Sequence, residues 1–561
     1  MKRAALLPLV LFCAACETTP PPVTPTSPGP GPGTAPVATA AAEDFRKKAP
    51  AAGPEAPYVA PNVQEARLGN GVRVLVVERH DLPVVAVQLV VDRGAAQDKP
   101  GVGAFAGGML MSGTRTRKAL ALSDELEQLG AEYGAYVGYD ASVVQGECLK
   151  PKLARMLDVL ADVVQNPSFA QDELDRERSR RLTALAQEND RPTALLANTV
   201  GTELYPANHP YSASLLATEA ALKGVQRADL VRFHKNAFAP DSTTVVFAGD
   251  VSKAEAVAEA ERVLGKWQGK AAKANTVGEP PAGVAKGPRV VIVDRPGASQ
   301  SNVAVALPGV PRQNPDFEAI LVMNTILGGM FSSRLNLNLR EKHAYTYGAR
   351  SGFEMRQGPG PFSAGGAVFR EKTDAALKEI LGEMDRIRAG MVTEEELAAA
   401  RSNLIKQLPG RFETAEETAA TIAALHVYKL PLDEFTNRPA RVQKVTREDV
   451  QRVAQKYLVA ERVKVVAVGD AATIRAGLGA LGLGEAEVRQ APGKPAAKSE
   501  GKSEGKSESK AESKADGKAT PPKPDGATGT PKPGTTPKPS GGPAAPPSPA
   551  PGSKPAGSTT K

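Results

Sequence analysis

VQRADLVRFHKNAFAPDSTTVVFAGD, at residues 225–250, returns in altered form as VQKVTREDVQRVAQKYLVAERVKVVAVGD at residues 442–470. In each copy a short helical pattern is followed by an apolar run that ends in Gly-Asp. A second pair of segments, FAQDELDRERSRRL from Phe169 and VTEEELAAARSNLI from Val392, precedes these copies in the same order. The copies lie about 220 residues apart, which is a domain-sized spacing and not that of a solenoid. The sequence therefore predicts a duplicated domain between about residues 63 and 483.

Each copy begins with runs rich in β-branched residues. GVRVLVVERHDLPVVAVQLVVD at 71–92 and PRVVIVDRPGASQSNVAVAL at 288–307 alternate around a turn that contains proline. Helical patterns such as LSDELEQLGAEYG and DAALKEILGEMDRIRAG follow. Strand pairs, then helices, then a returning strand indicate an α+β fold. We expect two homologous domains, each a mostly antiparallel sheet with helices packed on it, joined by a linker as a clam-shell.

Composition divides the chain into parts with different predicted roles. The segment GKAAKANTVGEPPAGVAKGP has no large apolar side chains, which suits an exposed hinge between domains. The predicted parts are a signal peptide at 1–16, a Pro/Thr/Ala-rich linker at 17–60, an N-terminal domain at 61–268, an interdomain linker at 269–288, a C-terminal domain at 289–485 and a disordered Lys/Pro/Ser/Ala-rich tail at 486–561.

The basic character of the chain belongs to its tail. Residues 492–561 contain twelve Lys against six Asp and Glu, and so hold six of the eight net positive charges. A basic tail could contact nucleic acid or an anionic envelope polymer. The evenly spaced pattern KSEGKSEGKSESKAESK is more typical of a solvated segment, so no nucleic-acid partner is expected.

The first sixteen residues, MKRAALLPLVLFCAAC, have the form of a targeting segment. Lys2 and Arg3 precede an apolar run that is too short to span a bilayer permanently. The ending resembles a bacterial lipoprotein cleavage box, with Cys16 as the lipidated residue, although Cys13 stands where that box usually has Leu. We expect a lipid anchor on the periplasmic side, on the outer membrane because Glu17 is not the Asp that favours inner-membrane retention in some bacteria. A plain secretory signal, which would give a periplasmic or secreted protein, is the alternative.

A second decisive stretch, GVGAFAGGMLMSGT from Gly101, resembles the active-site helix of the pitrilysin and insulinase-like zinc peptidases. These include the mitochondrial processing peptidase. Their helix contains His-x-x-Glu-His, in which residues i, i+3 and i+4 share one face. Two imidazoles there hold one zinc ion, and the Glu takes a proton from the bound water.

The frame of that motif is present in this chain but its chemistry is not. The matching frame residues are Gly101, Phe105, Met109, Leu110, Gly113 and Thr114. The resemblance places the two ligand positions at Ala104 and Gly108 and the general base at Gly107. The third ligand position, after the pair Glu177-Arg178, falls on or beside Ala184. None of these side chains can hold a metal, so the resemblance implies no cofactor in this chain, with zinc only in a partner subunit.

The histidine content leads to the same expectation without any family. The chain has five histidines, and no two lie within one helical turn of each other. A catalytic zinc site usually gathers two or three His or carboxylate ligands. We therefore expect each imidazole to be an ordinary surface or partly buried side chain.

Gly107 and Gly108 raise a local question. Each costs about 1 kcal/mol against Ala inside a helix. Either the pair allows another backbone to approach closely, or drift was tolerated once catalysis was lost. The sequence leaves both alternatives open.

The second copy retains a different part of the family pattern. GGMFSSRLNLNLREKHAYTYGARSGFE, from Gly328, is similar to the second-domain signature, in which Leu-Arg-Glu-Lys is followed by a Tyr seven residues after the Arg. Here the pair is Arg340 and Tyr347. The resemblance implies that both side chains bind the peptide substrate, Arg340 through planar donors and Tyr347 through a hydroxyl that stabilises an oxygen. The alternative is that Arg340 caps or pairs near a helix end while Tyr347 packs on a strand.

The division of residues has a precedent in the resembled family, where some members are heterodimers. One subunit carries the zinc motif, and the other carries the Arg/Tyr pair, as this chain does. We therefore expect the zinc-less subunit of a peptidase, inactive alone and paired with a zinc-bearing homologous subunit. The alternative is a catalytically dead protein that serves the envelope as a binding or scaffold protein.

Overall fold

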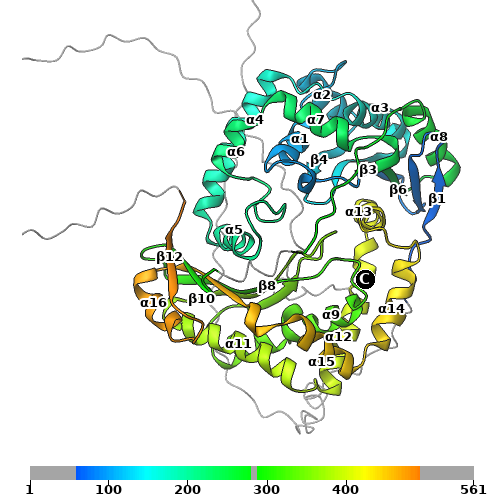
Figure 1. The fold of residues 1–561 in the computed structure, drawn as a ribbon. Helices are drawn as coiled ribbons and strands as arrows, with labels where there is room; N and C mark the ends of the chain where they lie inside the picture. Colours follow the sequence, from blue (N-terminus) through cyan, green and yellow to red (C-terminus); the bar gives the residue numbers. More distant parts are fainter. Residues whose placement is uncertain (1–57, 280–286, 493–561) are drawn as a thin grey trace, which may run out of the picture. The chain divides into compact units, whose positions relative to one another are not determined.

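The structure is a computed structural model that describes residues 58–279 and 287–492. Figure 1 shows its ribbon. The predicted signal peptide with Cys16, the linker up to residue 57 and the tail from residue 493 lie outside the described residues. Within the described ranges, no helix combines the length and the apolar character that crossing a membrane requires.

Two six-stranded sheets form the framework, one in each half of the described chain, 58–279 and 287–492. Their orders are β1-β2-β6-β3-β5-β4 and β12-β7-β11-β8-β10-β9. The strands of the first sheet are β1 Gln64–Arg67, β2 Arg73–Glu78, β3 Val84–Val91, β4 Glu132–Val137, β5 Ser142–Leu149 and β6 Thr243–Gly249. Those of the second are β7 Val290–Asp294, β8 Gln300–Pro308, β9 Arg350–Phe353, β10 Pro361–Phe369, β11 Lys464–Gly469 and β12 Ala486–Gln490.

Both sheets are mostly antiparallel, as predicted. The parallel pairs among the described strands are β2 with β6, β7 with β11 and β7 with β12. In each half the returning strand lies between the first two long strands and separates them. Val245 of β6 lies between β2 and β3, and Val466 of β11 lies between β7 and β8. Both strands are buried along their whole length, which explains their continuous apolar runs.

Helices cover the sheets in matching order. In the first half they are α1 Val102–Leu110, α2 Ala119–Gln128, α3 Leu153–Gln165, α4 Gln171–Asp190, α5 Pro192–Leu204, α6 Glu219–Gly224, α7 Arg227–Ala237 and α8 Lys253–Leu264. In the second half they are α9 Phe317–Asn324, α10 Arg334–Asn336, α11 Thr373–Ala389, α12 Glu394–Lys406, α13 Ala415–Val427, α14 Glu434–Lys444, α15 Arg447–Tyr457 and α16 Ala471–Gly479, with two π-helical segments, η6 Thr325–Gly329 and η7 Leu337–Lys342. Short 3₁₀ turns are η2 Ala95–Gln97, η3 Lys150–Lys152, η4 Pro240–Ser242, η8 Arg370–Lys372, η9 Pro409–Phe412 and η10 Ala460–Arg462. The repeated sequence pairs form α4 and α12, α7 and α15, and β6 and β11, so the predicted duplication is confirmed.

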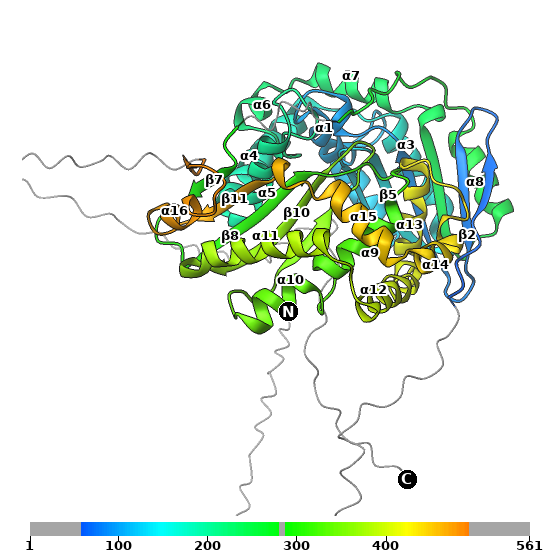
Figure 2. The same cartoon turned by 60° about the horizontal axis from the view of Figure 1, so that its bottom comes forward.

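In each half, one helix packs on the sheet of the other half. The helix α13, yellow in Figures 1 and 2, belongs to the second half but packs on β3 and β6 of the first sheet. Its fully buried Ile422 and Leu425 join a core that includes Leu75 and Val246. In return, α5 packs on β8 and β11 of the second sheet. Apolar side chains on one face of each sheet are thus buried only when both halves are present.

A polar junction also joins the halves. The Asp140 carboxylate accepts a hydrogen bond from the Tyr211 hydroxyl and one from the backbone N–H of Gln357, both at 2.8 Å. The guanidinium of Arg356 lies 3.9 Å from the ring centre of Tyr139. Burial raises the pKa of the Asp140 carboxyl. These contacts fix the 354–360 turn of the second half against the first half.

The predicted start of the disordered tail at residue 486 is wrong. Residues Ala486–Gln490 form β12, which pairs with β7 in parallel from Ala486↔Val290 to Gln490↔Asp294. This strand has few apolar residues because it lies at the sheet edge, where only Ala486 is buried. Its order comes from the backbone ladder with β7, which composition does not reveal.

Candidate functional site

The stretch from Gly101 forms the predicted helix α1 (blue in Figure 1). It begins at Gly101, whose φ of 88° is in the left-handed region that favours glycine. Phe105, Met109 and Leu110 are fully buried. The helix packs on β4, α4 and α7 of the first half, so the family frame serves as core packing.

The three positions that the resemblance assigns to the zinc ligands and the general base lie on α1. Ala104 and Gly107 are buried and Gly108 is half-buried. None carries an atom that binds a metal or accepts a proton. Across residues 58–279 and 287–492, no three His, Cys, Asp or Glu side chains lie close enough to hold a metal ion. The residues present do not fit the zinc ion that the family implies.

Gly107 is required by a close approach of backbone. A Cβ at this position would lie 2.7 Å from the backbone N of Val137, on the edge strand β4, and 3.1 Å from the backbone C of Tyr136. Backbone atoms of a paired strand cannot move aside cheaply. The sequence left two explanations for this glycine, close approach of another backbone and tolerated drift. The contact with β4 supports the first for Gly107.

Side-chain ends from α4 fill the space beside Gly108. A Cβ at residue 108 would lie 2.2 Å from Oε1 of Glu177 and 2.7 Å from Nη2 of Arg181. Arg181 donates through Nε to Glu177 Oε1 at 2.7 Å, and through Nη2 to the backbone carbonyl of Ala104. Burial lowers the pKa of Arg181. Ala184, the expected third ligand position, follows on α4 at i+3 from Arg181 and is half-buried.

Arg340 lies on a π-helical segment of the second half. Its guanidinium is 4.6 Å from the ring centre of Phe331, and its Nε is 3.5 Å from the carboxylate of Glu341. Its side chain is 38% exposed, and that of Phe331 is 67% exposed. Segments of π-helix are rare and occur often at functional sites. Arg340 is thus half-exposed in the last turn of η7, and its ion pair with Glu341 is the contact near a helix end that the alternative predicted.

Tyr347 is the most exposed of the expected site residues, at 81%. Its ring contacts that of Phe369, with ring centres 6.2 Å apart. Thr346 forms an isolated bridge to Val368 of β10, and residues 345–347 form no strand of their own. Tyr345 instead stacks on His343 at 4.9 Å. The hydroxyl of Tyr347 is accessible to a binding partner.

The expected metal-site positions and the expected substrate-binding residues lie on separate elements. The helix α1 packs within the first half, whereas η7 packs on α10 and α11 of the second half. Arg340 and Tyr347 lie on either side of Ala344, whose φ of 52° is unusual for a residue with a side chain. The Phe331–Arg340 contact and the Tyr347–Phe369 contact are therefore two exposed features of the second half.

The five histidines have five different surroundings. His80 lies 2.7 Å from Asp250, His209 stacks on Tyr205, His343 stacks on Tyr345, and His234 and His426 lie within hydrogen-bond distance of the backbone carbonyls of Val164 and Ser242. Burial lowers the pKa of His234 to about 4 and also lowers that of His426. Each imidazole thus has a local structural partner.

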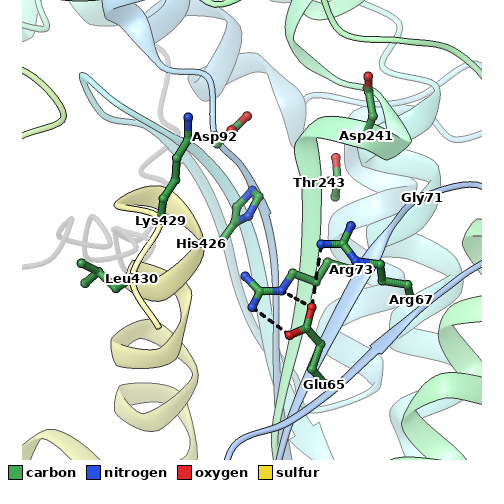
Figure 3. Close-up of a pocket in the computed structure, with 10 residues that line it drawn as sticks. All are labelled: Glu65, Arg67, Gly71, Arg73, Asp92, Asp241, Thr243, His426, Lys429 and Leu430. Carbon is green, nitrogen blue, oxygen red and sulfur yellow. Dashed lines mark hydrogen bonds and ion pairs between the residues drawn. The ribbon is translucent and has the colours of Figure 1, made fainter. Parts of the chain in front are cut away.

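A polar cavity of about 420 Å³ lies elsewhere, between the first sheet and the end of α13. Figure 3 shows His426 extending from α13 toward the strands, and Glu65 in ion pairs with Arg73 and Arg67. The cavity wall carries three acidic and three basic side chains, so its charge is balanced. Sequence reasoning missed this cavity because its lining residues lie up to 365 positions apart, from Glu65 to Leu430.

Comparison with known proteins identifies the class of this fold. A family model described as "Insulinase (Peptidase family M16)" matches residues 73–219, and one described as "Peptidase M16 inactive domain" matches residues 224–404. Together the two matches run from β2 into α12 and include strands and helices of both halves. The chain belongs to the insulinase, or M16, peptidase family, as the resemblance predicted.

Relatives agree with this assignment. The chain is 26% identical to an uncharacterized zinc protease of Rickettsia bellii, over 64% of this chain and 85% of the relative. It is 23% identical to a probable mitochondrial-processing peptidase subunit beta of Arabidopsis thaliana, over 73% and 79%. A solved M16 inactive-domain structure from Pseudomonas fluorescens superposes with a TM-score of 0.67 at 28% identity and covers 73% of this chain and 98% of its own.

Proposed function

We propose that this chain is the zinc-less subunit of an M16-type metallopeptidase and that a zinc-bearing homologous subunit completes the active site. One observation carries the proposal. The α1 face has no metal ligand and no general base, while Arg340 and Tyr347 remain exposed on the second half. A chain without any role in peptide binding has no need to keep this pair accessible.

The roles of the pair follow from their chemistry. The Arg340 guanidinium offers several N–H donors in a plane, which match a peptide carbonyl or a carboxylate. The Tyr347 hydroxyl can donate to the oxygen of the attacked peptide group, where negative charge develops during hydrolysis. The exposure of both side chains leaves these donors available to a peptide held between two subunits.

Heterodimer formation has support among the relatives. Two of them are named subunit beta of mitochondrial-processing peptidases, one from Arabidopsis thaliana and one from Blastocladiella emersonii. We propose the same kind of assembly for this chain, a heterodimer of two homologous subunits that acts on a peptide substrate.

Reconstitution with the partner tests the function. The partner is a co-purifying homologue with His-x-x-Glu-His, and the readout is cleavage of a peptide library by the pair. Arg340→Ala and Tyr347→Phe should each lower cleavage on the order of 100-fold while the subunits still associate. Lys342→Ala and Tyr345→Phe, on the same segment, are the matched controls and should keep activity.

Two results would contradict parts of this proposal. Full activity in both the Arg340 and the Tyr347 variants would remove their assigned roles. Co-purification only with proteins unrelated to peptidases would favour the alternative, a binding or scaffold protein of the envelope.

The proposal includes a lipid anchor at Cys16 on the periplasmic side of the outer membrane. The targeting segment MKRAALLPLVLFCAAC supports it. Labelling of cells with a fatty acid should mark the wild-type protein but not Cys16→Ser, and the variant should leave the membrane fraction. A cleaved, unlabelled wild-type protein would favour the plain secretory signal.

A further inference from the structure

We infer that the ion pair of Glu177 and Arg181 has replaced the metal centre as the link between α1 and α4. The positions that the family uses for metal ligands lie on these two helices, at Ala104 and Gly108 on α1 and at Ala184 on α4. Glu177, Arg181 and Ala184 are spaced at i, i+4 and i+7 and share one face of α4. This inference concerns the chain alone and goes beyond the proposed pairing with another subunit.

The pair is held at several points. Arg181 contacts Glu177 Oε1 at 2.7 Å, donates to the Ala104 carbonyl on α1, and lies 5.2 Å from the ring centre of Phe105. Glu177 is 3% exposed, and its second oxygen, Oε2, lies 2.9 Å from Arg180. Burying a carboxylate is costly unless a positive charge or hydrogen-bond donors compensate it. Arg181 supplies that charge and carries the contact across to α1.

The same pair excludes a metal ligand at residue 108. A Cβ at residue 108 would overlap Glu177 Oε1 and Arg181 Nη2. The first atom accepts a hydrogen bond from Arg181 Nε, and the second donates one to the Ala104 carbonyl. A side chain at 108 therefore requires the ends of Glu177 and Arg181 to move from the positions in which they form these bonds. Restored ligands therefore compete with the ion pair for one space.

The first experiment measures the link itself in the full chain. Arg181→Met leaves the Glu177 carboxylate buried without its main partner, so the unfolding equilibrium constant should rise on the order of 100-fold. Arg180→Met, which removes the exposed partner of the same carboxylate, should change it less than about fivefold. The double variant Glu177→Gln/Arg181→Met should recover much of the loss. Equal effects of Arg181→Met and Arg180→Met would overturn the inference.

The second experiment asks whether the pair excludes metal. One variant carries Ala104→His, Gly108→His and Ala184→Glu, which are three ligands of the type zinc prefers. A second variant adds Glu177→Ala and Arg181→Ala. Titration with zinc against a zinc-sensitive dye should show one bound ion only in the second variant, accompanied by a rise in its melting temperature. Equal zinc binding by both variants, or by neither, would overturn the exclusion.

Discussion

The two halves of the molecule share one sheet topology but differ in the helices that come after the second long strand. In the first half, β3 leads to α1, whose residues are nearly all buried. In the second half, β8 leads to α9 and then to two π-helical segments, with exposed Phe331 between them and half-exposed Arg340 in the second. The two sheets share one topology, while the helices beside them form a closed packing face in the first half and leave exposed side chains in the second.

A second difference lies at the outer edge of each sheet. The first sheet ends in β1, an antiparallel strand that precedes the other strands in the chain. The second ends in β12, a parallel strand that comes after the other strands. The same edge position is thus filled from opposite ends of the chain. Duplication therefore accounts for the other five strands of each sheet, β2-β6-β3-β5-β4 and β7-β11-β8-β10-β9, and not for β1 or β12.

The largest expected effect comes from the exchanged helix. Ile422→Asp places a charge where α13 packs on the first sheet, which should cost more than about 4 kcal/mol of stability. Although the substitution is in the second half, β3 and β6 of the first half should lose their hydrogen-exchange protection. Ala420→Asp, on the exposed side of α13, is the control and should leave protection intact. Loss of protection confined to the second half would show that the halves are independent.

Acid sensitivity should next distinguish α7 from its repeat counterpart α15. His234 on α7 corresponds in the repeat to Ala454 on α15. Burial lowers the pKa of His234 to about 4, whereas an unfolded histidine titrates near pH 6.5. The unfolded state therefore binds more protons between these values, and stability should fall on the order of 3 kcal/mol as pH drops from 6.5 to 4.

The variant His234→Ala places at this position the residue found at Ala454 in the second half. It tests whether His234 causes the acid sensitivity. Denaturant unfolding at several pH values should show a shallower loss of stability over the same window than in the wild type. An unchanged slope would show that another group causes the acid sensitivity.

Close packing of α1 should give the next effect. Alanine normally stabilises a helix by about 1 kcal/mol over glycine. Gly107→Ala should instead destabilise by roughly 1–3 kcal/mol, because its Cβ meets the β4 backbone. Gly479→Ala at the end of α16, where a Cβ meets open space, is the control and should be neutral or stabilising in thermal unfolding. A stabilised Gly107→Ala would mean that the approach of β4 does not constrain α1.

The smallest structural effect is expected at Tyr347. Tyr347→Phe should change the free energy of unfolding by less than about 0.5 kcal/mol, because the hydroxyl belongs to a side chain that is 81% exposed. A loss of peptide cleavage in this variant, measured with the partner subunit, would then come from the missing hydroxyl and not from unfolding. A large loss of stability would instead assign Tyr347 a structural role.

Much of the fold could be predicted because the repeated pattern covers whole strands and helices. The pairs α7 with α15 and β6 with β11 lie where the two copies predicted them. The exchange of α5 and α13 could not be predicted, because a helix sequence shows which face is apolar but not which sheet covers it. The strand β12 was missed for a related reason, since an edge strand held by its backbone ladder carries little apolar signal.

The candidate site was predicted in part. The helix at Gly101 lacks metal ligands by residue type alone, so Ala104, Gly107 and Gly108 were recognised from the sequence. The reason for the two glycines needed the structure, because Val137 and Arg181 approach from elements that are distant in the chain. A helical pattern over residues 171–190 carried one further signal, namely that Glu177, Arg181 and Ala184 share a face.

The most direct test combines metal content and activity. The purified chain alone should contain far less than one zinc per molecule and cleave no peptide, and activity should appear on addition of a His-x-x-Glu-His partner. One tightly bound zinc per chain, together with peptide cleavage by the chain alone that a chelator abolishes, would contradict the account.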